Sequence, residues 1–223
     1  MVKYNICSEY TAQASTFQPN RMVRLAIESL YHDKSCKVVS RKSKVADQGC
    51  GKLRHLKVLV ESFQRIHLVD QQVQLTRKQT LFGKSNKNVI DYVKNKFKKG
   101  RVSTLPSTKF AKTKLNLDVI LNACTFDVVT PNSRNEMTIA AHRNLRKGGV
   151  FILIVPRNDQ NILKRCNHEN KYCDGHVFSH HGIHTFFKNF RDHGPLIKNL
   201  KQVGFELLQD LSVYRHVCLI FKK

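Results

Sequence analysis

A glycine turn is the first feature of this sequence that could do chemistry. Gly49 and Gly51 stand between a short predicted strand, residues 43–46, and a stretch with helical periodicity, residues 53–63. In such an arrangement the glycines expose backbone N–H groups, and the amino end of the helix adds a partial positive charge. The turn therefore predicts a binding site for a ligand with polar groups at the carboxyl end of the strand.

An acidic residue ends the next predicted strand. Residues 65–69 form that strand, and Asp70 follows it, 19 residues after Gly51. A carboxylate in this position can accept hydrogen bonds from the hydroxyl groups of a ribose. A glycine turn by itself often marks only a tight connection between a strand and a helix. Together with Asp70, the turn favours a cofactor that contains a nucleoside.

Two classes of cofactor use this geometry. A nicotinamide dinucleotide requires a third glycine three residues after the second, where the pyrophosphate and the helix approach the turn closely. Arg54 occupies that position. Asp47, at the head of the turn, suits a cationic ammonium group better than a pyrophosphate. A cofactor with a methionyl ammonium group is therefore expected, and a nicotinamide cofactor is the minor alternative.

Helices and strands alternate along the chain, whose 223 residues are expected to form one domain, residues 1–223. Residues 1–40 are predicted to be an N-terminal helical cover, since apolar side chains recur at helical spacing after Asn20. Residues 71–88 are polar and give no assignment. The other predicted elements are helices at 89–97, 134–145 and 196–203, and strands at 101–105, 115–122, 150–155, 205–209 and 213–221.

The pattern of these strands predicts the fold class. Residues 150–155 are continuously apolar, as a central strand covered by helices on both faces must be. The last two strands are close enough in sequence to pair as an antiparallel hairpin. The predicted fold is α/β and doubly wound, with a mostly parallel seven-stranded sheet and an antiparallel terminal hairpin strand.

Four segments resemble the motifs of class I S-adenosylmethionine-dependent methyltransferases, which have a Rossmann-like fold. They are residues 45–52, 68–70, 117–122 and 145–149, within a region of similarity that spans residues 40–156. The resemblance implies a transferase that uses S-adenosyl-L-methionine as its cofactor. Its cofactor-binding residues would be Asp47, Gln48, Gly49, Cys50, Gly51, Asp70, Gln71 and Asn122.

The resemblance also implies roles for single residues. The glycine turn would surround the methionine part of the cofactor, Asp70 would hold the ribose, and Asn122 would face the methyl group as a catalytic residue. Leu53 replaces the third glycine of the usual motif. The third strand lacks the acidic residue that often contacts adenine, so the adenine contacts are expected near Ser103 and Thr104.

The charge of the chain indicates its partner. Lysine and arginine number 39 against 16 aspartates and glutamates, which gives a net charge of +23. The segment 77–114, which begins with Arg77 and ends with Lys114, holds twelve basic residues and one acid, Asp91. A nucleic acid offsets such an excess, because phosphate contacts release condensed counterions. This segment is therefore the expected basic surface for a nucleic acid.

Three functions stay open on these observations. The first is methyl transfer to a nucleic acid, with RNA favoured over DNA because residues 49–52 and 155–158 are similar to RNA cap guanine methyltransferases. The second is a small-molecule methyltransferase whose lysines form a solvated surface. The third is a basic nucleic-acid-binding module with an inactive cofactor site. Asn122 is followed by Ala123, Cys124 and Thr125 and not by two prolines and an aromatic residue, which disfavours methylation of the amino groups of adenine or cytosine.

Histidines and cysteines gather in residues 157–193, which are expected to form an irregular lid or insertion over the acceptor. Six histidines and two cysteines lie from Cys166 to His193. Their spacing matches no established zinc site, so no metal is expected. His180 and His181 are candidate catalytic bases, since histidine titrates near neutral pH. Histidines that only pack within a folded lid are the alternative.

The sequence also indicates the cellular location of the protein. Its longest apolar run, residues 150–155, is far shorter than the ~20 residues of a membrane-spanning helix, so no membrane partner is expected. The seven cysteines are scattered and odd in number, which does not indicate a disulfide framework. A soluble, cytoplasmic protein is expected, and nothing in the sequence indicates its oligomeric state.

Overall fold

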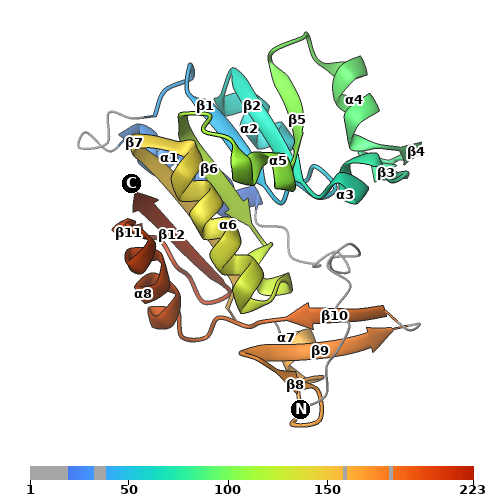
Figure 1. Ribbon diagram of the computed structural model, residues 1–223, viewed down its shortest axis with the longest axis vertical. Coiled ribbons are helices and arrows are strands. Elements are labelled where there is room, and N and C mark those ends of the chain that lie inside the picture. The colour runs from blue at the N-terminus through green and yellow to red at the C-terminus, as the bar shows by residue number, and fades with distance from the viewer. Residues whose placement is uncertain (1–19, 33–38, 158–159, 181–182) are drawn as a thin grey trace.

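A seven-stranded sheet forms the centre of the molecule in the computed structural model, which describes residues 20–32, 39–157, 160–180 and 183–223. In spatial order the strands are β11 (Glu206–Asp210), β12 (His216–Lys222), β7 (Leu145–Pro156), β6 (Leu117–Ala123), β1 (Lys44–Gln48), β2 (Arg65–Asp70) and β5 (Val102–Pro106). The five from β7 to β5 are parallel, and β12 pairs antiparallel with both β7 and β11. The predicted fold class is confirmed (Figure 1).

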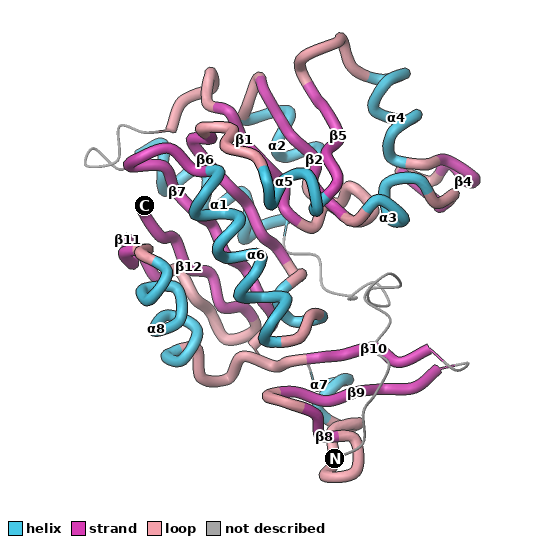
Figure 2. Tube along the Cα trace, in the orientation of Figure 1, coloured by secondary structure: helices cyan, strands magenta, loops and turns pink. Residues whose placement is uncertain are grey.

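Helices cover both faces of this sheet (Figure 2). One face carries α1 (Asn20–His32), α2 (Leu56–Ser62) and α4 (Val89–Lys96), and the other carries α5 (Ser107–Lys112), α6 (Pro131–Asn144) and α8 (Gly194–Val203). Strand β7 serves both layers, because Ile152 and Ile154 pack into the first core and Phe151 and Leu153 into the second. This double burial explains why the strand is continuously apolar. None of the described helices is long and apolar enough to cross a membrane.

The strand order reverses beside β1. The chain runs from β1 outward to β2 and β5, and then returns to place β6 on the other side of β1. At such a switch point the connections leave in opposite directions, and a crevice opens at the carboxyl ends of the strands. The glycine turn follows β1 and therefore lies at this crevice.

Several boundaries differ from the predicted ones. Strand β1 includes Asp47, and α2 begins at Leu56 rather than at residue 53, because Leu53 has a left-handed φ of 62° that a helix does not allow. The unassigned segment 71–88 contains α3 (Gln72–Thr76) and a hairpin of β3 (Gln79–Leu81) and β4 (Lys84–Lys87). Helix α1 agrees with the predicted N-terminal helix, and residues 1–19 and 33–38 lie outside the described residues.

A second sheet lies within residues 157–193, so the expectation that this segment is irregular was wrong, while its role as a lid or insertion stays a prediction. After α7 (Gln160–Leu163), β8 (Lys171–Tyr172), β9 (Gly175–His180) and β10 (Ile183–Phe187) form an antiparallel sheet in the order β10-β9-β8. The pair Val177 and Phe186 lies across β9 and β10, and both side chains are buried. Such cross-strand pairs stabilise a sheet although histidines interrupt its apolar pattern.

One buried arginine joins this small sheet to the main fold. Arg134 of α6 forms a salt bridge with Asp174, between β8 and β9, and its guanidinium lies 5.8 Å from the ring centroid of Phe186 and 5.4 Å from that of Phe190. The amide of Lys188 also donates a hydrogen bond of 2.7 Å to the carbonyl of Asp127, in the short helix η2 (Phe126–Val128). The small sheet is therefore attached at the connection that follows β6.

Candidate cofactor site

A cavity of about 530 Å³ opens at the carboxyl ends of β1, β2 and β6. This volume lies in the range of small-molecule sites. Its walls come from the glycine turn, from α3 and α5, from the connection after β6, and from α6. The backbone of the predicted turn and the predicted acidic residue Asp70 both line it, and so do Gln48, Cys50 and Gln71.

The glycine turn is fastened to the neighbouring strand. The amides of Gly49 and Cys50 both donate to the carbonyl of Val69, at 2.8 and 3.1 Å. Gly49 has a φ of 89°, and a Cβ at this position would lie 2.1 Å from Oγ1 of Thr125. Only glycine fits here, since both the backbone conformation and the close approach of the β6 connection exclude a side chain.

Asp70 holds the other half of the turn. Its Oδ2 accepts a hydrogen bond of 2.7 Å from the amide of Gly51, and its Oδ1 accepts one of 2.8 Å from the amide of Gln71. Burial raises the pKa of Asp70, although these two hydrogen bonds and the nearby Arg77 act in the opposite direction. Each carboxylate oxygen keeps a further lone pair. Asp70 can thus shape the turn and still accept a hydrogen bond from a ligand in the cavity.

Asp47 is a fully buried carboxyl group behind the turn. Both of its oxygens lack a hydrogen-bond partner among the described residues, and the side chain does not itself line the cavity. Burial, and secondly the charge of Asp70, raises the pKa of Asp47 to about 7. An uncompensated carboxyl group in such a place is costly when ionised. A cation held by the turn would relieve that cost.

Asn122 lies elsewhere than predicted. It is fully buried, its Nδ2 donates to Oε1 of Gln48 at 3.3 Å, and it is absent from the cavity wall. Because β6 continues for one more residue, Ala123, Cys124 and Thr125 line the cavity instead. Cys124 has a left-handed φ of 54°. Asn122 thus lies in the interior against Gln48 and not on the cavity wall, and its predicted role toward the methyl group stays a prediction.

The residues expected to contact adenine also differ from those that line the cavity. Ser103 and Thr104 do not line the cavity, and the hydroxyl of Ser103 forms a hydrogen bond of 2.8 Å with Nδ1 of His67. Ser107 and Thr108, at the start of α5, lie on the cavity wall in their place.

Four basic side chains on the cavity wall were not predicted as site residues: Lys52, Arg54, Arg77 and Lys112. Burial raises the pKa of the Cys124 thiol and the nearby Asp127 adds to this, but Arg54 lies close enough to lower it. The acidic lining residues are Asp70 and Glu136. The four basic residues lie in different helices and loops and follow no common sequence pattern. The sequence therefore did not show that they would lie on one cavity wall.

His55 connects the turn with the N-terminal helix. Its Nδ1 lies 2.9 Å from Oδ1 of Asn20, at the start of α1. Burial, and secondly the positive charge of Arg54, lowers the pKa of His55 to about 4. The ring is thus neutral at physiological pH and acts as a fixed hydrogen-bonding group at the cavity wall.

The described part of the chain places neither predicted histidine base on the cavity wall. Strand β9 ends at His180, and His181 lies outside the described part of the chain. No described residue beyond Ala140 lines the cavity. Within the described ranges, no three histidine, cysteine, aspartate or glutamate side chains come together as a metal site would require. The catalytic role of His180 and His181 stays a prediction.

Comparison of the sequence with known proteins does not by itself identify a family. No protein-family model matches the chain. Over 214 residues the sequence is 26% identical to the uncharacterized protein YmfD of Escherichia coli (strain K12), covering 96% of this chain and 82% of that protein.

Solved structures of methyltransferases superpose on nearly the whole chain. The 1,6-didemethyltoxoflavin-N1-methyltransferase of Burkholderia thailandensis, with bound S-adenosylhomocysteine, has a TM-score of 0.57 at 15% identity over 96% of this chain and 93% of that one. The magnesium protoporphyrin IX methyltransferase of Synechocystis has a TM-score of 0.60 at 12% identity over 96% and 90%. A methyltransferase of Methanosarcina mazei has 0.59 at 11% over 86% and 97%. The chain thus has the Rossmann-like fold of class I S-adenosylmethionine-dependent methyltransferases.

Proposed function

We propose that this chain binds S-adenosylmethionine in the cavity at the carboxyl ends of β1 and β2 and is a methyltransferase. The observation that carries the proposal is the glycine turn, whose Gly51 amide is held by the carboxylate of Asp70 at 2.7 Å at the switch point of the sheet. The backbone of the turn would bind the methionine part, and Asp70 would bind the ribose. The unpaired Asp47 carboxyl group behind the turn fits a ligand with positive charge.

The protein's own residues need to do little chemistry beyond positioning. The bound cofactor supplies an activated methyl group on a sulfonium. The chain must orient an acceptor in line with that group and exclude water, and both depend on rigid walls. Phe110 and Met137 supply apolar wall on the α5 and α6 side, and Cys124 and Thr125 form the wall after β6. The turn and β2 provide the rigid half of the site through the hydrogen bonds to Val69.

Calorimetric titration with S-adenosylmethionine tests the cofactor proposal. Asp70→Ala should weaken binding by roughly ten- to a hundredfold, because hydrogen bonds to a charged group are lost. Asp118→Ala is the matched control: its carboxylate accepts a bond of 2.7 Å from the amide of Lys44 and pairs with Arg146, but it lies off the cavity. This control should bind like the wild type. Absence of binding to the wild-type protein at millimolar cofactor would refute the proposal.

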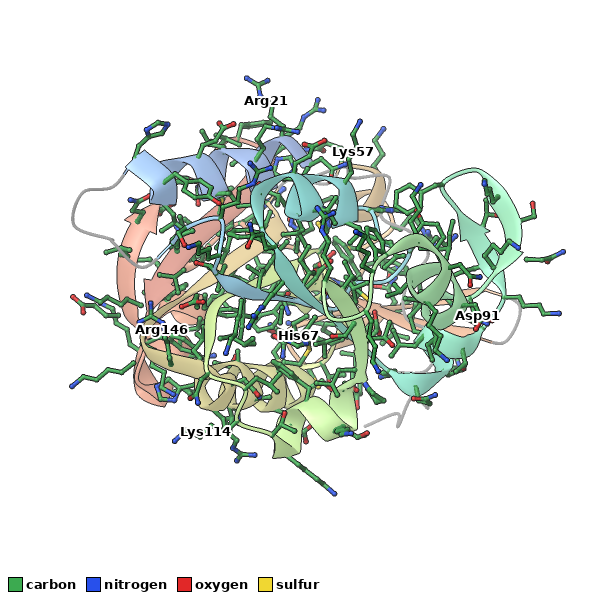
Figure 3. The ribbon with its side chains drawn as sticks, turned by 90° about the horizontal axis from the view of Figure 1, so that it is seen from above. Arg21, Lys57, His67, Asp91, Lys114 and Arg146 are labelled. Carbon is green, nitrogen blue, oxygen red and sulfur yellow. The ribbon has the colours of Figure 1, made fainter. Side chains whose placement is uncertain are left out.

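For the acceptor we propose a nucleic acid, with RNA favoured. Basic side chains lie at the periphery on several sides of the molecule, such as Arg21, Lys57 and Lys114 in Figure 3, so net charge alone selects no surface. The segment 77–114 differs in its composition, because its twelve basic residues stand against a single acid, Asp91. Lys52, Arg54 and Lys112 on the cavity wall also favour an anionic acceptor, since the cofactor itself carries net positive charge.

Transfer of labelled methyl groups to fractionated cell extract tests this acceptor. Label in the RNA fraction, with binding that weakens steeply as salt rises, is the expected result. Label in the metabolite fraction would favour a small-molecule methyltransferase. Cofactor binding without transfer to any fraction, together with RNA binding, would favour a binding module with an inactive cofactor site.

A further inference from the structure

The hairpin of β3 and β4 carries an aromatic side chain at its tip that the fold does not bury. Phe82 is 51% exposed, and with Gly83 it forms a turn in which both residues have a positive φ, 49° and 76°. The ring of Phe82 is stacked on Tyr92 of α4, with 5.3 Å between the centroids and 26° between the planes. One face of the ring is therefore covered and held in place, and the other face is open to solvent.

Lysines follow this ring along the hairpin and form no salt bridge with a described residue. All four residues of β4 are exposed, and Lys84 and Lys87 stand at its two ends. Asp91 is the single acid of the segment 77–114, and it lies in the first turn of α4, where its Oδ2 accepts a hydrogen bond of 2.6 Å from Nδ2 of Asn88. Figure 3 shows Asp91 at the outer end of the molecule among nitrogen-tipped side chains. The surface thus combines uncompensated lysines with a fixed aromatic face.

The hairpin is also connected directly to the cavity. Gln79 of β3 and Gln74 of α3 form two hydrogen bonds, at 3.2 Å between their side chains and at 3.3 Å from Nε2 of Gln79 to the carbonyl of Gln74. Gln74 is buried and lines the cavity, as does Arg77 between the two elements. A strand of nucleic acid bound on the hairpin would therefore continue toward the cavity.

We infer that the β3–β4 hairpin and α4 bind single-stranded nucleic acid, with lysines at the phosphates and the open face of Phe82 stacked on an unpaired base. A duplex does not fit this arrangement, because its bases are already stacked on one another. Aromatic platforms within a basic groove bind single strands without requiring a particular sequence. This inference rests on the proposed function for the acceptor class and names the surface that holds it.

The absence of tryptophan from the sequence permits a direct test. Phe82→Trp places a single indole at the hairpin tip, and its fluorescence should be quenched when a base stacks on it. The titrants are a single-stranded RNA oligonucleotide, the same sequence as a duplex, and inorganic polyphosphate, which has charge but no bases. Quenching by the single strand alone is expected. Equal quenching by the duplex, or binding of the single strand without quenching, would overturn the inference.

Affinity measurements with Phe82→Ala complete the test. Loss of one stacked base should weaken binding of the single strand roughly ten- to a hundredfold. Tyr214→Ala, which removes an aromatic side chain that is 72% exposed near the β11–β12 edge of the sheet, is the matched control and should bind like the wild type. Equal effects of the two variants would overturn the inference. Cofactor affinity should be unchanged in both, so failure of the wild type to bind S-adenosylmethionine would count against the proposed function and not against the hairpin.

Discussion

Asp47→Asn should change how the stability of the protein depends on pH. The carboxyl group of Asp47 is fully buried and has no hydrogen-bond partner among the described residues, and its pKa is about 7 instead of the ordinary 3.8. The folded state therefore keeps this proton over a range in which the unfolded chain has lost it. Asparagine has nearly the same shape and no proton to lose.

The sign follows from proton linkage. A carboxyl group whose pKa is raised by folding stabilises the folded state fully below pH 3.8, and this contribution is lost as the pH rises toward 7. The free energy of unfolding of the wild type should therefore fall relative to that of Asp47→Asn by roughly 2 to 3 kcal/mol between pH 5 and 7.5. His55, whose pKa is lowered to about 4, has the opposite dependence, but it is common to both proteins and cancels in the difference.

Urea denaturation of both proteins across that pH range measures the difference. Asp210→Asn is a control of opposite sign, because hydrogen bonds from Ser212 and His193 lower the pKa of Asp210 although partial burial raises it. Because this lowered pKa lies below 3.8, the difference between the wild type and Asp210→Asn should be constant between pH 5 and 7.5, and the wild type should lose stability relative to this variant only as the pH falls below about 4. A constant difference between the wild type and Asp47→Asn at every pH would refute the reasoning, since it would mean that the Asp47 carboxyl group does not titrate in this range.

Three further predictions concern the site and its supports. At pH 6, S-adenosylmethionine should release protons from the wild type and none from Asp47→Asn, because a positive ligand lowers the pKa of Asp47; calorimetry in buffers of different ionisation enthalpy measures the release. Gly49→Ala should abolish cofactor binding, since its Cβ would lie 2.1 Å from Thr125 Oγ1, while Gly100→Ala, at a similar φ of 88° in open space, should lose only about 1 to 2 kcal/mol of stability. The steric clash should also make the loss of stability larger for Gly49→Ala than for Gly100→Ala, and equal losses would contradict the steric argument. Arg134→Met should speed amide hydrogen exchange in β9 and β10 more than in β7, and a uniform change would contradict its anchoring role.

The sheet and the cofactor turn could be predicted because the physics that shapes them is local. A strand buried on both faces must be continuously apolar, which identified residues 150–155 as the central strand β7. Asp70 directly follows a predicted strand, Gly49 stands three residues after another, and parallel strands end at one edge of the sheet. Their sequence positions alone therefore placed them together, and the hydrogen bond from Gly51 to Asp70 is the consequence.

The orientation of single side chains at the strand ends could not be predicted in this way. Successive side chains of a strand point to opposite faces, so an error of one residue in the end of β6 exchanges the cavity wall for the interior. This happened at Asn122, which packs on Gln48 while Cys124 and Thr125 reach the cavity. The small sheet was missed for a different reason, because its stability comes from pairs such as Val177 and Phe186, which are distant in sequence.

Topology indicates where selection of the acceptor should be sought. The β3–β4 hairpin follows the carboxyl end of β2, and the small sheet follows that of β7, and these strands are parallel. Both additions therefore begin at the edge of the sheet where the cavity lies (Figure 1). The cavity walls described above need the glycine turn, β2, α5 and α6, but neither addition. The hairpin has the uncompensated charge and the open ring of Phe82, whereas the small sheet is fixed to α6 by Arg134. We therefore expect the hairpin to determine which class of acceptor binds.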